Sequence, residues 1–550
     1  MKKTEGLKRY SIFWYLGIAV LIIVVTAFLV PLFFSFAQLF TSEKFVANDV
    51  STNVLNHFAE NVIKFFSMPR LRNAIIFSVL QAFFSCLISL LLGIPAAYYL
   101  SKKKIVGSKI LNSLSCVPLC IPSILIALAF VLFYGRQGLL NKFLMWSFNL
   151  SEPPISFLYS FWGVVFTHGV YNFPLVMGTV ASRWRLIPRE QEDAACLLKA
   201  NKWRIFRTIT LPQLKPAIIS SAVLVFLYCF FSFGILLLFG GFGFSTLEVE
   251  LYYTIKSSFD FSLAAVIALF ETLLGLVIVS IYFLISKKDS SIKEISGTLS
   301  PLKPFESLKE KIFAIIFLAI ICLLFGGPLI SLIVSSFTVK NGFLGFNTIS
   351  LSNYITLFTR TVFWKSFFTT ICVSFFSATL ATVVGVVLAR IQKSTLSKIL
   401  TMLPMAVSGI ILGLGWMKIM PRGNVWVLII AQASLFFPIA LRQIQTGFEK
   451  IPPELEQAAL LLGSSKHECL FRVLLPQIKE NIITAWCFVF AASAGDITLP
   501  LVLSIPDFNS LSLLLYQLAG SYRFGEACCC GIVLGLCTGI FWLRKKRINK

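Results

Sequence analysis

Three ionisable side chains, Asp496, Glu271 and His168, lie inside long apolar stretches of the sequence. Ionisable groups at membrane depth are costly, and they commonly mark the path of a solute or an ion. Asp496 follows Gly495 in a segment of small residues where helices can pack closely, so we expect its carboxylate to line a passage and attract a cation. A carboxylate bonded to a neighbouring helix is an equally good interpretation of Asp496, and such a structural role is favoured for Glu271 and His168.

Catalysis by this chain is not indicated. The three histidines are dispersed over an external loop, an apolar span and a cytoplasmic loop, and they form no set with serine and aspartate. The thirteen cysteines show no paired Cys-x-x-Cys spacing, so neither a metal nor a disulfide is expected. The glycine-rich phosphate loop of ATPases is also missing from the sequence. We therefore expect a chain that is not an enzyme and that binds no ATP, metal or other cofactor by itself.

The elements that must position these groups are membrane helices. Of the 550 residues, 57% are hydrophobic and 13% are charged, against roughly 25% charged residues in a soluble domain. Apolar runs of about 20 residues are long enough to cross a bilayer, and they predict an all-α polytopic membrane protein with about twelve transmembrane helices. The runs lie near residues 11–40, 72–100, 112–134, 157–181, 217–240, 262–285, 312–336, 366–389, 399–417, 425–441, 482–504 and 524–543.

The charges indicate how the chain is oriented. The formal charge of +24 comes from 48 Lys and Arg against 24 Asp and Glu, and twelve crossings place most of the cations in cytoplasmic segments, as the positive-inside rule requires. Both termini are then cytoplasmic. Membrane lipid is expected as a partner of the basic clusters, and nucleic acid is not. A polar stretch divides the chain into a first six-helix half, residues 1–286, a cytoplasmic linker, 287–311, and a second six-helix half, 312–550.

Two cytoplasmic loops repeat one another. Residues 187–219 and 451–483 align without gaps at an offset of 264, and 15 of the 33 positions are identical. Loops are under no general pressure to look alike, so this duplication is more informative than a likeness between two apolar spans. Two equivalent helices presented on one face suit a partner that has two equivalent subunits. The alternative is an amphipathic helix that lies on the lipid surface.

Each copy of the loop reads as a helix, a break and a second helix. Pro188 and Pro452 suit a helix start, and the acidic residues that follow favour the positive end of the helix. Asn201 and Ser465, at matched positions, suit the N-cap of the second helix. We expect this second helix to end before the Leu-Pro pair of each loop, where the chain enters the membrane.

These loops resemble the EAA motif of permeases of binding-protein-dependent ABC importers, which runs from Glu-Ala-Ala through a glycine to a terminal Leu-Pro. In that family the loop is the coupling helix that sits in a cleft of the ATPase subunit, and the resemblance assigns this role to the matched residues. They are Glu192, Asp193, Ala194, Ala195, Leu211 and Pro212 in the first copy, and Glu456, Ala458, Ala459, Gly463, Leu475 and Pro476 in the second. Lys199 replaces the glycine in the first copy, and because lysine adopts left-handed backbone angles poorly, we expect the tight turn to be disturbed there.

The resemblance also implies partners and a solute. Because both halves are fused, it implies one copy of this chain in the inner (cytoplasmic) membrane with two ATP-binding subunits, which hold ATP and Mg, and an external solute-binding protein. Alternating access is the implied mechanism. Several segments are similar to the thiamine importer permease, which implies thiamine or its phosphate esters as the solute; they are residues 134–138, 168–174, 246–252 and 515–523.

Other transport functions stay open. The ferric-iron permease shares the fused layout and the coupling motif, so iron is the nearest rival solute. A secondary transporter can also show twelve spans and internal repeats, but it needs no ATPase and leaves the duplicated loop unexplained. Thiamine is a cation with aromatic rings, and a passage for it should offer aromatic faces and an acid, which is the role expected of Asp496.

Overall fold

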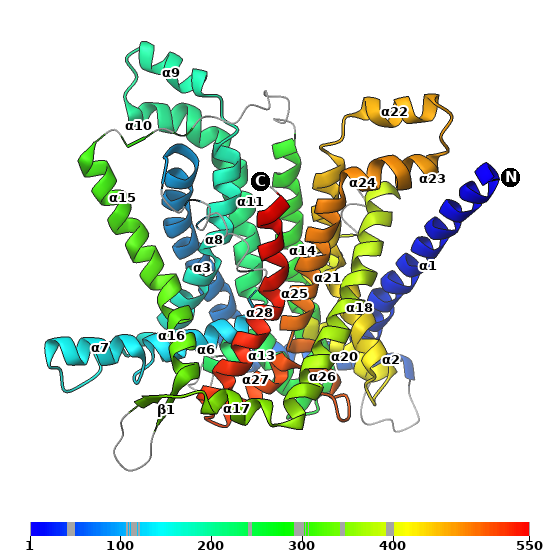
Figure 1. Ribbon diagram of the computed structural model, residues 1–550. Coiled ribbons are helices and arrows are strands. Elements are labelled where there is room, and N and C mark those ends of the chain that lie inside the picture. Colours follow the sequence, from blue (N-terminus) through cyan, green and yellow to red (C-terminus); the bar gives the residue numbers. More distant parts are fainter. Residues whose placement is uncertain are drawn as a thin grey trace.

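The computed structural model describes residues 2–40, 50–105, 121–239, 245–290, 307–340, 347–391 and 401–548, with isolated positions between 106 and 120 and between 301 and 306. Nearly all of these residues are helical (Figure 1). One antiparallel pair of three-residue strands, β1 (Thr338–Lys340) and β2 (Asn347–Ile349), lies at the lower edge of the view. The predicted all-α membrane architecture is confirmed.

The helices follow the same order in the two halves of the chain. The first half contains α1 (Lys2–Ala37), α2 (Val50–Ser67), α3 (Pro69–Lys102), α6 (Ser123–Tyr134), α7 (Leu139–Phe148), α8 (Phe161–Trp184), α9 (Arg189–Leu197), α10 (Lys202–Ile205), α11 (Leu211–Phe230), α12 (Gly234–Phe239), α13 (Leu247–Lys256) and α14 (Phe261–Ser290). The second contains α15 (Leu308–Ile321), α16 (Gly327–Phe337), α17 (Ser352–Phe358), α18 (Thr361–Ile391), α20 (Gly409–Ile419), α21 (Val425–Phe448), α22 (Pro453–Leu461), α23 (Lys466–Cys469), α24 (Leu475–Gln477), α25 (Lys479–Gly495), α26 (Thr498–Leu503), α27 (Leu511–Gly520) and α28 (Phe524–Ile548).

The predicted apolar runs all contain helices, although not all of these are long. Nine helices in the described residues are long and apolar enough to cross a membrane, and a pair bent by 74°, Lys466–Gln477 with Lys479–Gly495, raises the number to ten. The run predicted at 399–417 holds α20, which has 11 residues. The run predicted at 524–543 falls within α28.

The membrane helices bury small and polar side chains and expose large apolar ones. In α3, Ser78, Ser85 and Ser89 are buried, whereas Phe83 and Leu91 are exposed. Bare apolar surface on the outside suits lipid, and small residues inside let helices approach closely. The contact of α3 with α8 shows this, because a Cβ built on Gly93 would lie 2.7 Å from Val176 Cβ and the Ser89 hydroxyl donates to Gly169 O at 2.9 Å.

The first helix of each half packs against the opposite half. α1 lies along α18, α20 and α21, where the Ser35 hydroxyl donates to Ile411 O at 2.7 Å (Figure 1). α16 packs in turn against α6, and the Ser331 hydroxyl donates to Ala129 O at 3.2 Å. The two halves of the sequence are therefore not two separate bodies in space.

The predicted division at residues 286 and 312 falls beside residues 291–300, which lie outside the described parts. α14 continues to Ser290 and α15 begins at Leu308. The Ser307 hydroxyl caps α15 by accepting a hydrogen bond from Glu310 N at 3.2 Å. The domain boundaries stay a prediction.

Candidate functional site: two matched loops and a central cavity

The two duplicated loops lie at the end of the molecule where both chain termini are found (Figure 1). α9 and α22 are each nine residues long and begin at positions that differ by the same offset of 264, Arg189 and Pro453. The four-residue helices α10 and α23 follow at that offset as well. The predicted order of helix, break and second helix is confirmed in both copies.

α9 and α22 end in the same left-handed turn. Lys199 has a φ of +59° and Gly463 a φ of +85°. The N–H of Lys199 donates to Cys196 O at 2.9 Å and that of Ala200 to Ala195 O at 3.1 Å, which is the Schellman arrangement of a helix end. The expectation that Lys199 disturbs the turn is wrong, because these backbone hydrogen bonds hold the lysine in left-handed angles.

The second helix of each loop begins at the predicted cap. Asn201 Oδ1 accepts a hydrogen bond from Arg204 N at 2.7 Å, and Ser465 Oγ accepts one from Glu468 N at 3.2 Å. Each cap satisfies one of the N–H groups that a helix start leaves without a partner.

The second helix does not end before the Leu-Pro pair, which corrects the sequence-based expectation. One π-helical turn, Phe206–Thr210 in the first loop and Leu470–Leu474 in the second, carries the helix onward through the pair. The wider turn accommodates Pro212 and Pro476, since proline has no N–H to donate to the preceding turn. The first duplicated loop is thus continuous with the membrane helix α11, whereas in the second the helix ends at Gln477 and α25 begins at Lys479 after a bend of 74°.

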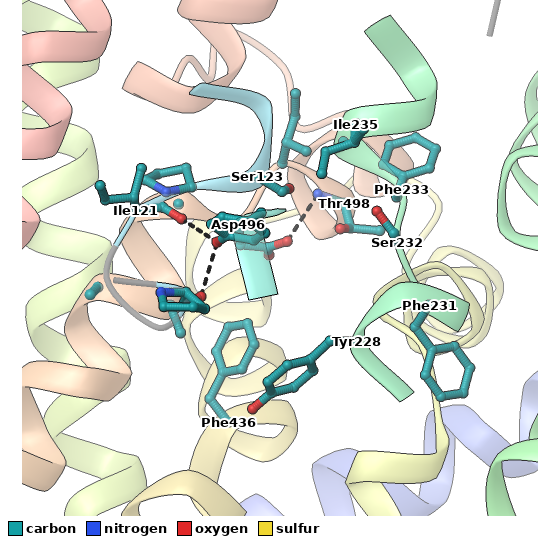
Figure 2. Close-up of a pocket in the computed structure, with 18 of the residues that line it drawn as sticks. Ile121, Ser123, Tyr228, Phe231, Ser232, Phe233, Ile235, Phe436, Asp496 and Thr498 are labelled. Atoms are coloured by element: carbon teal, nitrogen blue, oxygen red, sulfur yellow. Dashed lines mark hydrogen bonds between the residues drawn. The ribbon is translucent and has the colours of Figure 1, made fainter. Parts of the chain in front are cut away.

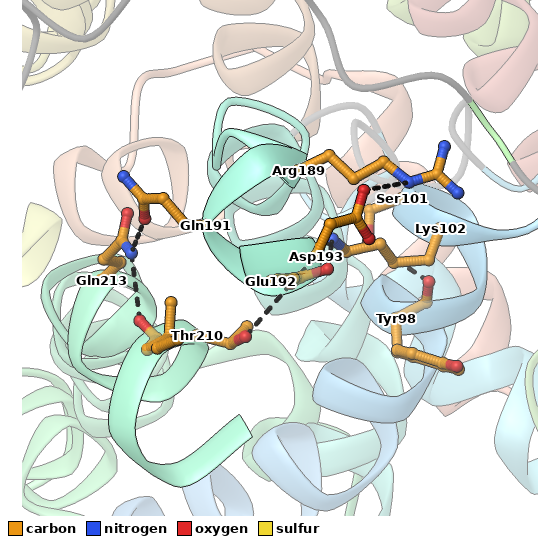
Figure 3. Close-up of polar contacts among 10 residues, drawn as sticks. Tyr98, Ser101, Lys102, Arg189, Gln191, Glu192, Asp193, Thr210 and Gln213 are labelled. Carbon is orange, nitrogen blue, oxygen red and sulfur yellow. Dashed lines mark hydrogen bonds and ion pairs between the residues drawn. The ribbon is translucent and has the colours of Figure 1, made fainter. Parts of the chain in front are cut away.

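One glutamate of each loop is paired with a cation at the end of a membrane helix. Lys102 Nζ, in the last turn of α3, donates to the two carboxylate oxygens of Glu192 at 2.9 and 2.8 Å (Figure 3). Arg390, in the last turn of α18, donates to Glu456 at 2.7 Å. The hydrogen bond and the charge of Arg390 hold the pKa of Glu456 below its ordinary value. Both glutamates belong to the predicted motif, whereas the two cations were not predicted.

The outer face of each loop is apolar and exposed. Four leucines at matched positions are 84 to 88% exposed, namely Leu197, Leu198, Leu461 and Leu462. Exposed apolar side chains gathered in this way mark an interaction surface. Among the predicted small residues, Ala194 and Ala458 are exposed, while Ala459 is buried against Cys469 and Leu470. Asp193 also points outward, and its carboxylate lies 4.0 Å from Arg189 Nε.

A cavity of about 280 Å³ lies between the two halves and contains two of the three predicted pathway residues, Asp496 and His168. Asp496 accepts a hydrogen bond from Thr498 N at 2.9 Å (Figure 2). It accepts another from Gln432 Nε2 at 3.0 Å. Among the described residues that line the cavity, Asp496 is the single carboxylate and none is a lysine or arginine. Aromatic side chains line the same cavity; they belong to Tyr171, Tyr228, Phe231, Phe233, Phe436 and Phe488.

The cavity lining contains matched positions of the two halves. Asn172 and Phe436 are separated by 264 residues, and so are Ser232 and Asp496. The chain is irregular around Ser232 and Asp496, between α11 and α12 and between α25 and α26. Non-helical backbone at membrane depth is tolerated where it lines a cavity, and broken helices of this kind form substrate sites in transporters.

Glu271 lies away from this cavity. It is fully buried on α14, next to the buried carboxyl of Glu248 on α13, and neither of its oxygens has a hydrogen-bond donor among the described residues. The structural role favoured for Glu271 and the pathway role considered for it both stay predictions. His168 lines the same cavity as Asp496.

A second cavity, of about 490 Å³, lies between α8 and α21 and shares three lining residues with the first, Tyr228, Ile439 and Phe488. It is lined by residues nearer the coupling loops, including Ser182 on α8 and Thr446 on α21. The two cavities therefore form consecutive chambers along the interface of the halves, with the three shared side chains between them.

Comparison with known proteins assigns the family. The family model described as "Binding-protein-dependent transport system inner membrane component" matches residues 89–289 and 393–543, so each match contains one of the duplicated loops. The chain belongs to this family. It is thus the inner-membrane permease component of an ABC importer, with the fused two-half architecture that the repeat predicts.

Several named permeases are similar to this one. The thiamine transport system permease protein ThiP of Escherichia coli (strain K12) is 26% identical over 497 residues, covering 86% of this chain and 88% of its own. ThiP of Brucella abortus (strain 2308) is 25% identical over 489 residues, covering 85% and 86%. A Salmonella typhi protein, provisionally named 2-aminoethylphosphonate transport system permease protein PhnU, is 34% identical over 207 residues, which is 38% of this chain and 72% of that one.

A solved structure matches part of the permease. It is the crystal structure of a bacterial ABC transporter involved in the import of the acidic polysaccharide alginate. The match covers 54% of this chain and 100% of that chain, with a TM-score of 0.40 and 14% sequence identity.

Proposed function

We propose that this permease carries thiamine or its phosphate esters from an external binding protein to the cytoplasm by ATP-driven alternating access. The observation that carries the proposal is the cavity between the halves, where one carboxylate, Asp496, lies among aromatic rings. A quaternary, aromatic cation is attracted by a carboxylate and by the faces of aromatic rings. The ThiP relatives, which match most of the chain, are named for transport of this solute.

The proposed partners are two ATPase subunits and one solute-binding protein. The two loops present matched exposed leucines, Leu197 with Leu198 and Leu461 with Leu462, and two equal surfaces suit a partner that comes as two equal subunits. ATP and Mg are held by those subunits and no cofactor is held by this chain. The loops and both termini lie at one end of the molecule (Figure 1), so docking of the ATPase there makes both termini cytoplasmic.

The proposed mechanism uses the loops as levers on the cavity. Each loop is joined to a membrane helix through a π-helical turn and is paired with another through Glu192 or Glu456. Closure of the ATPase dimer brings the loops together and moves the helices of the two halves as rigid bodies. The side chains between the two cavities, Tyr228, Ile439 and Phe488, then part to let the solute pass.

Replacement of Asp496 tests the solute path. In the complete importer reconstituted in vesicles, Asp496→Asn should lower thiamine uptake about tenfold, because loss of roughly 1.4 kcal/mol of attraction corresponds to that factor. Asp496→Glu, which keeps the charge, should retain most of the uptake. Asp507→Asn, the same substitution at an exposed aspartate outside the cavity lining, serves as the control and should have little effect. Unchanged uptake by Asp496→Asn at normal expression would contradict the role given to this carboxylate.

Ferric iron remains the alternative solute. The iron permease shares the coupling motif, and the binding protein selects the solute in this class of importer. A secondary transporter is disfavoured by the two exposed leucine pairs, because it has no ATPase subunit for these pairs to contact. These alternatives predict different responses of ATP hydrolysis to a loaded binding protein.

A further inference from the structure

The second cavity differs from the first in the sign of its charge. Its charged lining residue is Arg442, on α21, and the described lining contains no carboxylate. The equivalent position of the other half, 264 residues earlier, is Gly178 on α8, which lines the same cavity from the opposite side. At these two matched positions the cavity therefore carries one guanidinium, and the glycine contributes no side chain opposite it.

We propose that this second cavity is an oxyanion subsite, in which Arg442 receives the phosphoryl or phosphonyl group of the transported solute. The proposal rests on the proposed import function and names the part of the solute that the cavity takes. Arginine presents a planar set of N–H donors that matches the oxygens of a phosphate group. A phosphate ester of thiamine, rather than thiamine alone, is then the solute that uses both chambers.

The surroundings of Arg442 hold the side chain without neutralising it. Its Cζ lies 5.0 Å from the centroid of the Tyr282 ring, a cation–π contact that orients the guanidinium. Its N–H groups donate no hydrogen bond to any residue in the described parts of the chain. Within the described parts of the chain, no carboxylate forms an ion pair with it. Glu449, which acts on Arg442 through space, lies further along the chain and outside the cavity lining.

The other polar groups of the cavity add little competition for an anion. The Ser182 and Thr446 hydroxyls donate to the carbonyls of their own helices, Gly178 O and Gln443 O, each at 2.7 Å. The Gln443 amide is a further donor in the lining. The Thr179 and Tyr228 hydroxyls also belong to the lining. An oxyanion in this cavity therefore meets one guanidinium, an amide and hydroxyl groups, and no negative charge from the described lining.

The order of the two charges suits a solute with both a cationic and an anionic group. Gln432, which binds Asp496, and Arg442 lie on the same helix, ten residues apart in the sequence. At 1.5 Å per residue this spacing is about 15 Å along the helix axis. This spacing exceeds the distance between the cationic and phosphoryl groups of a thiamine phosphate, so a solute meets the two charges in turn, the carboxylate in the first chamber and the arginine in the second.

The test compares two solutes in the complete reconstituted importer. Uptake of thiamine and of thiamine monophosphate is measured for Arg442→Gly, which copies the residue of the other half, for Arg442→Lys, and for Arg422→Gly as a control arginine outside the cavity. We expect Arg442→Gly to lower monophosphate uptake about tenfold relative to thiamine uptake, with Arg442→Lys in between and Arg422→Gly without effect. An equal loss of both solutes, or no change in either, would overturn the proposal.

A second readout does not depend on the solute. The complete importer is treated with phenylglyoxal, which modifies accessible arginines, and labelling of Arg442 is followed by peptide mass spectrometry. Inorganic phosphate should protect Arg442, and acetate at the same concentration should not, whereas labelling of Arg422 should be indifferent to both. Equal labelling of Arg442 with and without phosphate would overturn the subsite. A wild-type importer that takes up no thiamine would count against the proposed function and leave this second result standing.

Discussion

At the scale of residues, two ion pairs hold the coupling loops to the helix bundle. Lys102 with Glu192 and Arg390 with Glu456 perform the same task in the two halves. The glutamates could be found from the repeat, since they are separated by its offset of 264. The cations could not, because they lie on distant helices and are separated by 288 positions instead, so only the packing of α3 and α18 reveals that they are equivalent.

The pairing of Glu456 predicts a dependence on pH. Arg390 lowers the pKa of the folded-state carboxyl from its ordinary value of 4.5. The ionised carboxylate therefore stabilises the folded loop at pH values above 4.5, and this contribution is lost as the pH falls through the lowered folded-state value. We expect wild type to have a higher thermal midpoint than Glu456→Gln at pH 6 in detergent, with the difference vanishing in acid. A difference that stays constant over this range would contradict the ion pair.

The left-handed residue Lys199 predicts a stabilising substitution. A side chain with a Cβ is strained by about 1 kcal/mol at such angles, so Lys199→Gly should slow hydrogen exchange of the amides at the end of α9. The reverse change, Gly463→Lys, is the matched control, because a Cβ at Gly463 meets nothing within 4 Å and only the backbone cost applies. Exchange at the end of α22 should become faster. Faster exchange in Lys199→Gly and slower exchange in Gly463→Lys would show that the left-handed backbone angles do not determine the stability of these turns.

At the scale of elements, the sequence repeat predicts the coupling loops closely. The helix, the break, the caps and the equivalence of the two copies all follow from residues that are local in sequence. The π-helical turns at Phe206–Thr210 and Leu470–Leu474 could not be predicted from the sequence. A proline commonly marks the end of a helix, and only the structure shows that the helix continues through the Leu-Pro pair. The length of α20 (Gly409–Ile419) could not be predicted either, because an apolar run in the sequence does not indicate where its helix ends.

The exposed leucines of the loops predict a loss of coupling when they are made polar. Leu461→Asp introduces a charge at a position where the leucine side chain is 88% exposed. Because this side chain packs little against the rest of the protein, folding should be unaffected. Co-purification of the ATPase subunit and ATP-driven uptake should both fall at least about tenfold, as for a central interface residue. Leu351→Asp, at a leucine 59% exposed outside the coupling loops, is the control. Full retention of the ATPase by Leu461→Asp would contradict the assigned surface.

At the scale of the whole molecule, the two halves enclose two cavities at their common interface. The sequence offers Asp496, Glu271 and His168 as candidates for a solute path, with a structural role favoured for Glu271 and His168, and the structure brings Asp496 and His168 to one cavity while Glu271 lies elsewhere. That grouping depends on the tertiary arrangement of α8 and the end of α25, which no local pattern encodes. The packing of α1 and α16 against the opposite half could not be predicted from sequence periodicity either. An apolar helix pattern does not indicate which half of the protein the helix packs against.

ATP hydrolysis by the complete importer tests both the proposed solute and the proposed role of the two duplicated loops. This permease is reconstituted in vesicles with its ATPase subunits, and hydrolysis is compared after addition of a thiamine-loaded or an iron-loaded binding protein. We expect the thiamine-loaded protein to stimulate hydrolysis and the iron-loaded protein to have no effect. Stimulation by the iron-loaded protein alone would contradict the proposed solute, and failure of any ATPase subunit to assemble with the permease would contradict the coupling role of the two loops.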